Sequence, residues 1–278
     1  MPIDQQKLNK EYIFKGRGVA GELLPGLDQV APIEAKLKAR PSRVRWLALA
    51  VFVACAVIAV AGGGPLFFLL GIVAPLGLVI YSAFLGATPI LHDRVEVLRG
   101  ALNLLSQDAG SKGRFEVQLR LRANKGQISE GPDPRLSGGK QILFRDPWLT
   151  LSGRLSDGTS ISESYVDLIR QRTKKNPRGK TKKKERRMCL IRVHLDYNTA
   201  IYGDASIASS RLKNRFRLPA GAQLKAFNPS AKSLDIKAVI RGDLTAATLH
   251  AVNEAILLGA YRILNLARRR VIAAGGAE

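Results

Sequence analysis

A long stretch near the start of the chain is almost wholly apolar. Residues 46–87 carry no Asp, Glu, Lys, Arg or His, and the run is broken once, by Gly-Gly-Gly-Pro at positions 62–65. A helix that crosses a membrane needs about 20 apolar residues, because the hydrocarbon core is about 30 Å thick. The pattern therefore predicts two membrane-spanning helices, Trp46–Ala61 and Leu66–Ala87, joined by a tight turn.

Basic residues flank both ends of this predicted hairpin. Arg40, Arg43 and Arg45 precede it, and Arg94 and Arg99 follow it. Lys and Arg near a span mark its cytoplasmic side. We therefore predict an integral protein of a bacterial inner (plasma) membrane with both termini in the cytoplasm. A cleaved signal peptide and a buried helical hairpin of a soluble core are the alternatives, and the position and length of the run favour them less.

The remainder of the chain shows the two-residue alternation of half-buried strands. Apolar and polar residues alternate over Arg114–Arg122 and again over Met188–Tyr197. Trp148–Leu155 and Thr159–Ile169 read as a further pair of strands, with Ser-Asp-Gly at 156–158 as the turn between them. Short turns of this kind join antiparallel neighbours, so an antiparallel sheet is predicted.

Helical spacing of apolar residues appears on both sides of the predicted strands. A stripe follows the hairpin within residues 90–106, and a longer one runs from Leu244 to Leu264. The predicted fold is therefore an α+β membrane protein, in which a two-helix transmembrane hairpin precedes a cytoplasmic antiparallel β-domain closed by a long C-terminal helix. Its parts are an irregular cytoplasmic tail at 1–45, the hairpin at 46–88 and the basic domain at 89–278.

Charge is concentrated in one part of the basic domain. The chain has 44 Lys and Arg against 22 Asp and Glu, a net charge of +22. Residues 170–187 hold eleven of these cations and a single acid, Glu185. Because this run lies between the predicted strands Thr159–Ile169 and Met188–Tyr197, we expect it to form the hyperbasic tip of a long antiparallel ribbon.

The cations of this tip are the predicted anion-binding residues. They are Lys174, Lys175, Arg178, Lys180, Lys182, Lys183, Lys184, Arg186 and Arg187. Lys and Arg displace counterions from phosphates, and they are attracted to anionic lipid headgroups. The run contains no aromatic residue, which disfavours stacking on single-stranded bases.

Catalytic and metal motifs are weak in this sequence. His194 and Asp196 lie two residues apart and would share one face of a strand, so an enzyme that uses them is one alternative. No phosphate-cradling glycine motif occurs, and the two cysteines, Cys55 and Cys189, have no metal-ligand spacing. We therefore predict neither a cofactor nor a metal.

These observations predict a membrane-anchored, non-enzymatic binding domain that contacts an anionic surface through its hyperbasic loop. The expected partners are membrane lipids, with nucleic acid or an acidic protein as possible alternatives. A second interpretation is an accessory subunit, in which the helical hairpin packs against a partner membrane subunit.

Overall fold

A computed structural model gives the fold of the chain. It describes residues 4, 7–8, 11–58, 60–61, 65–86, 91–110, 113–133, 139–175, 180–206, 216–242 and 244–275. The chain divides into two compact units. The first joins Met1–Pro25 to Leu91–Glu278, and the second is Gly26–Ile90. We describe each unit by itself.

The second unit is a helical hairpin. Helix α3 spans Val30–Ile58 and helix α4 spans Pro65–Gly86. The two helices approach closely, because a Cβ atom added at Gly71 would lie 2.9 Å from the Cβ atom of Cys55. Many large apolar side chains on both helices remain exposed, Trp46 at 69% and Leu69 at 60% among them. Extended apolar surfaces of this kind are typical of surfaces that another molecule covers.

The prediction of a transmembrane hairpin is wrong. Within the described part of the chain, no helix combines the length and the apolar character that crossing a membrane requires. The predicted first span continues from the basic segment before it in one helix, α3. Its uncharged part runs from Trp46 to Ile58, about 20 Å of helix against a hydrocarbon core of about 30 Å. The predicted placement as an integral membrane protein is corrected for the same reason.

The first unit is built on an antiparallel sheet. Its strand order is β1-β2-β4-β5-β6-β8-β7, and β3 pairs with β4 outside this path. The strands are β1 Ile13–Val19, β2 Arg114–Arg120, β3 Gly126–Pro132, β4 Lys140–Arg154, β5 Ser160–Lys175, β6 Thr181–Asp196, β7 Ala222–Pro229 and β8 Ser233–Arg241. Every pairing is antiparallel, so the α+β class and the antiparallel sheet are as the sequence indicates.

The N-terminal segment is more regular than the sequence indicates. Instead of an irregular tail over residues 1–45, strand β1 pairs with β2, and helix α2 (Ala20–Asp28) follows it directly. The alternation in β1 is short and contains two glycines, so it resembles a loop in the sequence alone. Phe14 is fully buried and fixes the strand to the core.

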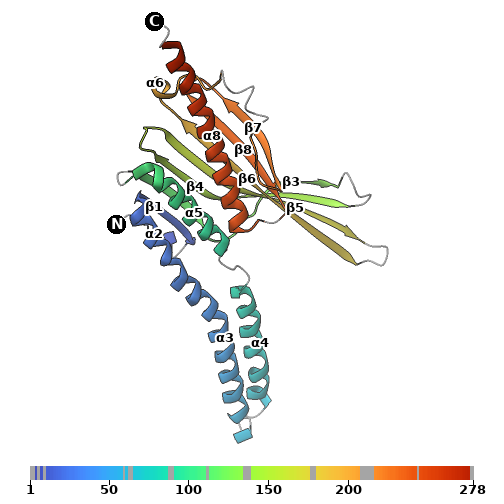
Figure 1. The fold of residues 1–278 in the computed structure, drawn as a ribbon. Coiled ribbons are helices and arrows are strands. Elements are labelled where there is room, and N and C mark those ends of the chain that lie inside the picture. The colour runs from blue at the N-terminus through green and yellow to red at the C-terminus, as the bar shows by residue number, and fades with distance from the viewer. Residues whose placement is uncertain are drawn as a thin grey trace. The chain divides into compact units, whose positions relative to one another are not determined.

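Two helices cover one face of the sheet, as Figure 1 shows. Helix α5 (His92–Ala109) contacts β2 and β4, and helix α8 (Ala246–Gly275) contacts β6 and β8. Helix α6 (Thr199–Tyr202) is a single turn that contacts α8. The predicted closing helix at the C-terminus is therefore present. The face that α5 and α8 cover is called the covered face below, and the opposite one the open face.

The covered face holds the core of the unit. Its strand side chains are almost fully buried and include Val117, Leu151, Tyr165, Ile191 and Ile236. Side chains of α5 and α8 complete this core; they include Leu98, Leu102, Val252 and Ile256. Since side chains alternate along a strand, the residues between these positions point to the open face.

A buried ion cluster ties α5 to the sheet within this core. Arg94 donates to Asp146 at 2.6 Å and to Asp167 at 3.2 Å, and it also donates to the carbonyl of Arg120 at 3.1 Å. The indole of Trp148 donates to the second oxygen of Asp167 at 3.0 Å. Asp146 and Asp167 are direct neighbours across β4 and β5, so the guanidinium bridges two carboxylates that would otherwise repel each other.

Candidate anion-binding arm

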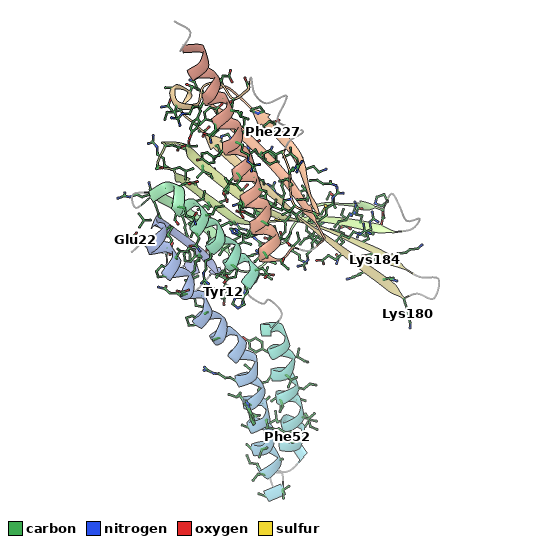
Figure 2. All side chains as sticks on the ribbon, viewed as in Figure 1. Tyr12, Glu22, Phe52, Lys180, Lys184 and Phe227 are labelled. Atoms are coloured by element: carbon green, nitrogen blue, oxygen red, sulfur yellow. The ribbon has the colours of Figure 1, made fainter. Side chains whose placement is uncertain are left out.

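Strands β5 and β6 are longer than the neighbours that flank them. They pair without a bulge from Ser160 opposite Asp196 to Lys175 opposite Thr181. Strand β8 follows β6 no further than Met188, and β4 follows β5 as far as Thr173. We call residues 170–175 and 180–187 the distal arm. Figure 1 shows it extending beyond β7 and β8, and Figure 2 labels Lys180 and Lys184 at its end.

The arm carries its cations on one face in opposed pairs. Direct cross-strand neighbours are Arg170 and Arg186, Arg172 and Lys184, and Lys174 and Lys182. We call these six residues the basic face. They lie on the open face of the sheet, because Ile169, the residue directly before Arg170, is buried on the covered face and successive side chains of a strand alternate. Like charges directly opposite each other on a sheet destabilise it, so this arrangement costs free energy in the unbound protein.

Acidic residues balance the opposite face of the arm better than the basic face. Glu185, the one acid of residues 170–187, forms ion pairs with Arg187 at 2.7 Å and with Lys125 at 3.5 Å. Partial burial raises the pKa of Glu185, but the hydrogen bond from Arg187 and the charge of Lys125 outweigh it and hold the pKa below its ordinary value. On the basic face, Arg172 has an ion pair with Asp133 at 3.2 Å.

The structure places most of the predicted anion-binding residues. Lys174, Lys182, Lys184 and Arg186 lie on the basic face. Lys183 and Arg187 belong to the opposite face, and Lys180 lies just before β6. The side chain of Lys175 is not among those described, although its backbone ends β5, and Arg178 lies outside the described residues.

Sequence reasoning missed Arg170 and Arg172 as members of the site. Both lie in the predicted hyperbasic tip at 170–187, but neither is among the predicted anion-binding residues. The signal that could have identified them is the two-residue step from Arg170 to Arg172 to Lys174, since a period of two places all three on one strand face.

The predicted His194 and Asp196 pair forms a second, smaller polar cluster on the open face. His194 Nε2 lies 3.1 Å from Asp196 Oδ1, and Ser162 is the direct cross-strand neighbour of His194. A hollow of about 150 Å³ is lined by Ser162, Ser164, Arg192 and His194. The neighbourhood that the sequence indicated is therefore real. A hydrolase needs its serine hydrogen-bonded to the base, and the contact described for His194 is to the carboxylate.

A third polar group is buried under α8. The side chain of Glu163 is fully buried, and Asn253 of α8 donates to its two oxygens at 3.3 and 3.2 Å. The hydroxyl of Tyr165 donates to it at 3.4 Å. Burial raises the pKa of Glu163 to about 7, although both hydrogen bonds lower it. Alternation in the sequence does not reveal the burial of Glu163, because it does not say which face of a sheet a helix covers.

The described residues contain no group of three His, Cys, Asp or Glu side chains that could hold a metal ion. Comparisons with protein-family models, with curated proteins and with solved structures gave no match to this chain. The basic face is therefore the feature from which a function is argued.

Proposed function

We propose that this protein is a non-enzymatic binding protein that captures a polyanion on the basic face of its distal arm. The observation that carries the proposal is the set of three directly opposed cation pairs, Arg170 with Arg186, Arg172 with Lys184, and Lys174 with Lys182. A sheet without a ligand is destabilised by such pairs, whereas a bound polyanion would turn each repulsion into two attractions.

Local electrostatics support this proposal. The repulsive pairs gather on the one face of the arm to which Glu185 does not point. Nearer their other end the same strands place a neutral serine opposite a cation, as at Ser164 and Arg192, and Arg192 instead pairs with Asp235 at 2.6 Å. Arg192 of the open face is thus matched with an acid, whereas each opposed pair of the basic face sets one cation against another.

The experiment compares two variants with the same change in charge. The basic-face variant is Lys182→Gln, Lys184→Gln and Arg186→Gln; the opposite-face variant is Lys125→Gln, Lys183→Gln and Arg187→Gln. Binding to inorganic polyphosphate is measured by biolayer interferometry at two salt concentrations. We expect the basic-face variant to lose about tenfold or more in affinity and the opposite-face variant less than about threefold, since phosphate contacts act locally.

Thermal unfolding of both variants establishes that each is folded at the assay temperature. Equal losses in the two variants would mean that net charge, and not the basic face, attracts the anion. Unchanged binding in both would reject the proposal.

A further inference from the structure

We infer that the polyanion is the phosphate backbone of a nucleic-acid duplex, bound through the basic face without reading the base sequence. This inference rests on the proposed function and names its partner. It depends on the spacing of the cations, on the side chains that the arm lacks and on the cations that border it.

The spacing of the cations suits a regular array of phosphates. Side chains two residues apart on a strand are about 6.8 Å apart, so Arg170, Arg172 and Lys174 cover about 14 Å, with a matching row on β6 about 5 Å away. A duplex carries one phosphate charge per about 1.7 Å of its axis, or about eight over the same length. Six cations at regular spacing, of which Arg172 is already paired with Asp133, would therefore face a regular array of anions.

The fixed spacing also distinguishes a duplex from a lipid surface. Headgroups in a fluid leaflet rearrange around any cluster of cations, so an unstructured lysine run binds them without help from a strand ladder. Here the ladder holds Arg170, Arg172 and Arg186 at set positions, and the planar guanidinium suits bidentate contact with a phosphate.

The arm lacks the side chains that other nucleic-acid and membrane sites use. Residues 170–187 contain no Phe, Trp or Tyr and no Leu, Ile, Val or Met. Without aromatic rings there is no platform for unpaired bases, and without apolar side chains nothing inserts below the headgroups. Contacts with a phosphate backbone need neither.

The open face next to the arm extends the same surface. Arg145 lies opposite Leu168, and Arg241 lies opposite Met188, so two further cations border the basic face in the next row of the sheet. Further along, Asp235 forms ion pairs with both Arg192 and Lys237, at 2.6 and 3.4 Å, so an acid partly balances the positive charge there. The resulting footprint of about eight cations sets an upper limit on the phosphates contacted.

The test measures binding of the full chain to a 20-base-pair duplex by fluorescence anisotropy over a range of salt concentrations. For the wild type we expect log K to fall steeply with log salt, with a slope of up to about −7 for eight contacts. The basic-face variant should lower the magnitude of this slope by about 2.7, and the opposite-face variant by less than about 1. Two duplexes of unrelated sequence should bind within about threefold of each other.

Two further probes separate this inference from the proposed function. They are a single strand of the same length and vesicles of 30% phosphatidylserine in phosphatidylcholine. Weaker binding to both than to the duplex supports the inference. Vesicle or single-strand binding as tight as duplex binding, and lost in the basic-face variant, overturns the inference and leaves the proposed function standing. If the duplex, the single strand and the vesicles each bind the two variants equally well, the inference and the proposed function are both overturned.

Discussion

The two halves of the β5–β6 ribbon belong to the same pair of strands and have opposite energetics. In the proximal half, Tyr165 and Ile191 are cross-strand neighbours in the core beneath α8, where burial of apolar surface stabilises the fold. In the distal half, Arg172 and Lys184 are cross-strand neighbours that repel each other. One continuous strand pair thus joins a proximal half that stabilises the fold to a distal half that destabilises it. The distal half depends on the proximal half to remain folded.

The polar groups of the two halves differ in the same way. On the covered face, Asp167 of the proximal half accepts a hydrogen bond from Arg94, which also donates to Asp146 of β4. The distal half exposes Lys182 and Lys184 to solvent, and each lies directly opposite another cation. Opposed like charges therefore distinguish the distal half from the buried ion cluster.

The largest expected effect is the loss of Arg94 from the proximal half. Arg94→Ala would leave Asp146 and Asp167 facing each other in the core, and removal of one partner from a buried ion pair costs about 3–5 kcal/mol. We expect a loss of this size in the free energy of unfolding, measured with urea. Burial already raises the pKa of Asp167 against the opposing effects of Arg94 and Trp148, so the loss should be smaller at acidic pH.

Arg99→Ala is the control for this variant. Arg99 lies five residues after Arg94 in α5. It forms an exposed ion pair with Glu96 at 3.2 Å. Exposed pairs of this kind contribute about 0–1 kcal/mol. Similar losses of stability in Arg94→Ala and Arg99→Ala would show that the buried ion cluster does not stabilise the fold as described above.

The next effect in size concerns the buried carboxyl of Glu163. Its pKa of about 7 in the folded protein lies above the ordinary glutamate pKa of 4.5, which applies to the unfolded chain, so the folded state holds the proton more tightly. Its contribution to stability is therefore fully present below about pH 4.5 and is lost as the pH rises through 7. Glu163→Gln should remove this loss. The free energy of unfolding of the variant should therefore rise relative to that of the wild type by about 3 kcal/mol between pH 4 and pH 8.

Urea unfolding of the wild type and of Glu163→Gln from pH 4 to pH 8 measures this difference. Glu116→Gln, on the exposed open face, should leave the pH profile of the wild type unchanged. Parallel profiles for the wild type and Glu163→Gln would show that Glu163 is not the group that titrates.

The smallest expected effect is the one that sets the distal half apart most clearly. The basic-face variant (Lys182, Lys184 and Arg186 to Gln) removes one partner from each opposed pair and should stabilise the fold by about 0.5–1 kcal/mol at low salt. The gain should vanish near 1 M salt, where the screening length is about 3 Å. Urea unfolding at 20 mM and 1 M sodium chloride tests this. A loss of stability in the variant would contradict the repulsion on which the comparison depends.

The ribbon was predictable from the sequence because both of its strands show clear alternation. Thr159–Ile169 and Met188–Tyr197 were expected to be antiparallel partners, and they are. Strand pairing continues further into the basic run than expected, since β5 ends at Lys175 and β6 begins at Thr181. A charged strand resembles a loop in the sequence, and the neighbouring β4 supports it as far as Thr173.

Long-range contacts account for what the sequence did not reveal. The basic flank at Arg94 suggested an orientation signal, whereas its side chain reaches Asp146 and Asp167, which lie 52 and 73 residues away in the chain. The apolar run likewise suggested two spans, Trp46–Ala61 and Leu66–Ala87, the first of which begins directly after Arg45. Helix α3 instead begins at Val30 and continues through the basic segment, so local charge does not mark its start.

The absence of a bulge between β5 and β6 has a consequence for how the arm is aimed. Since the pairing is continuous, displacement of either strand by a single position would expose Tyr165 and Ile191 to water and bury cations beneath α8. The buried core therefore fixes the direction in which a cationic surface several residues away faces. Substitutions in the distal arm can therefore change the affinity of this surface for a partner without changing the direction in which the surface faces.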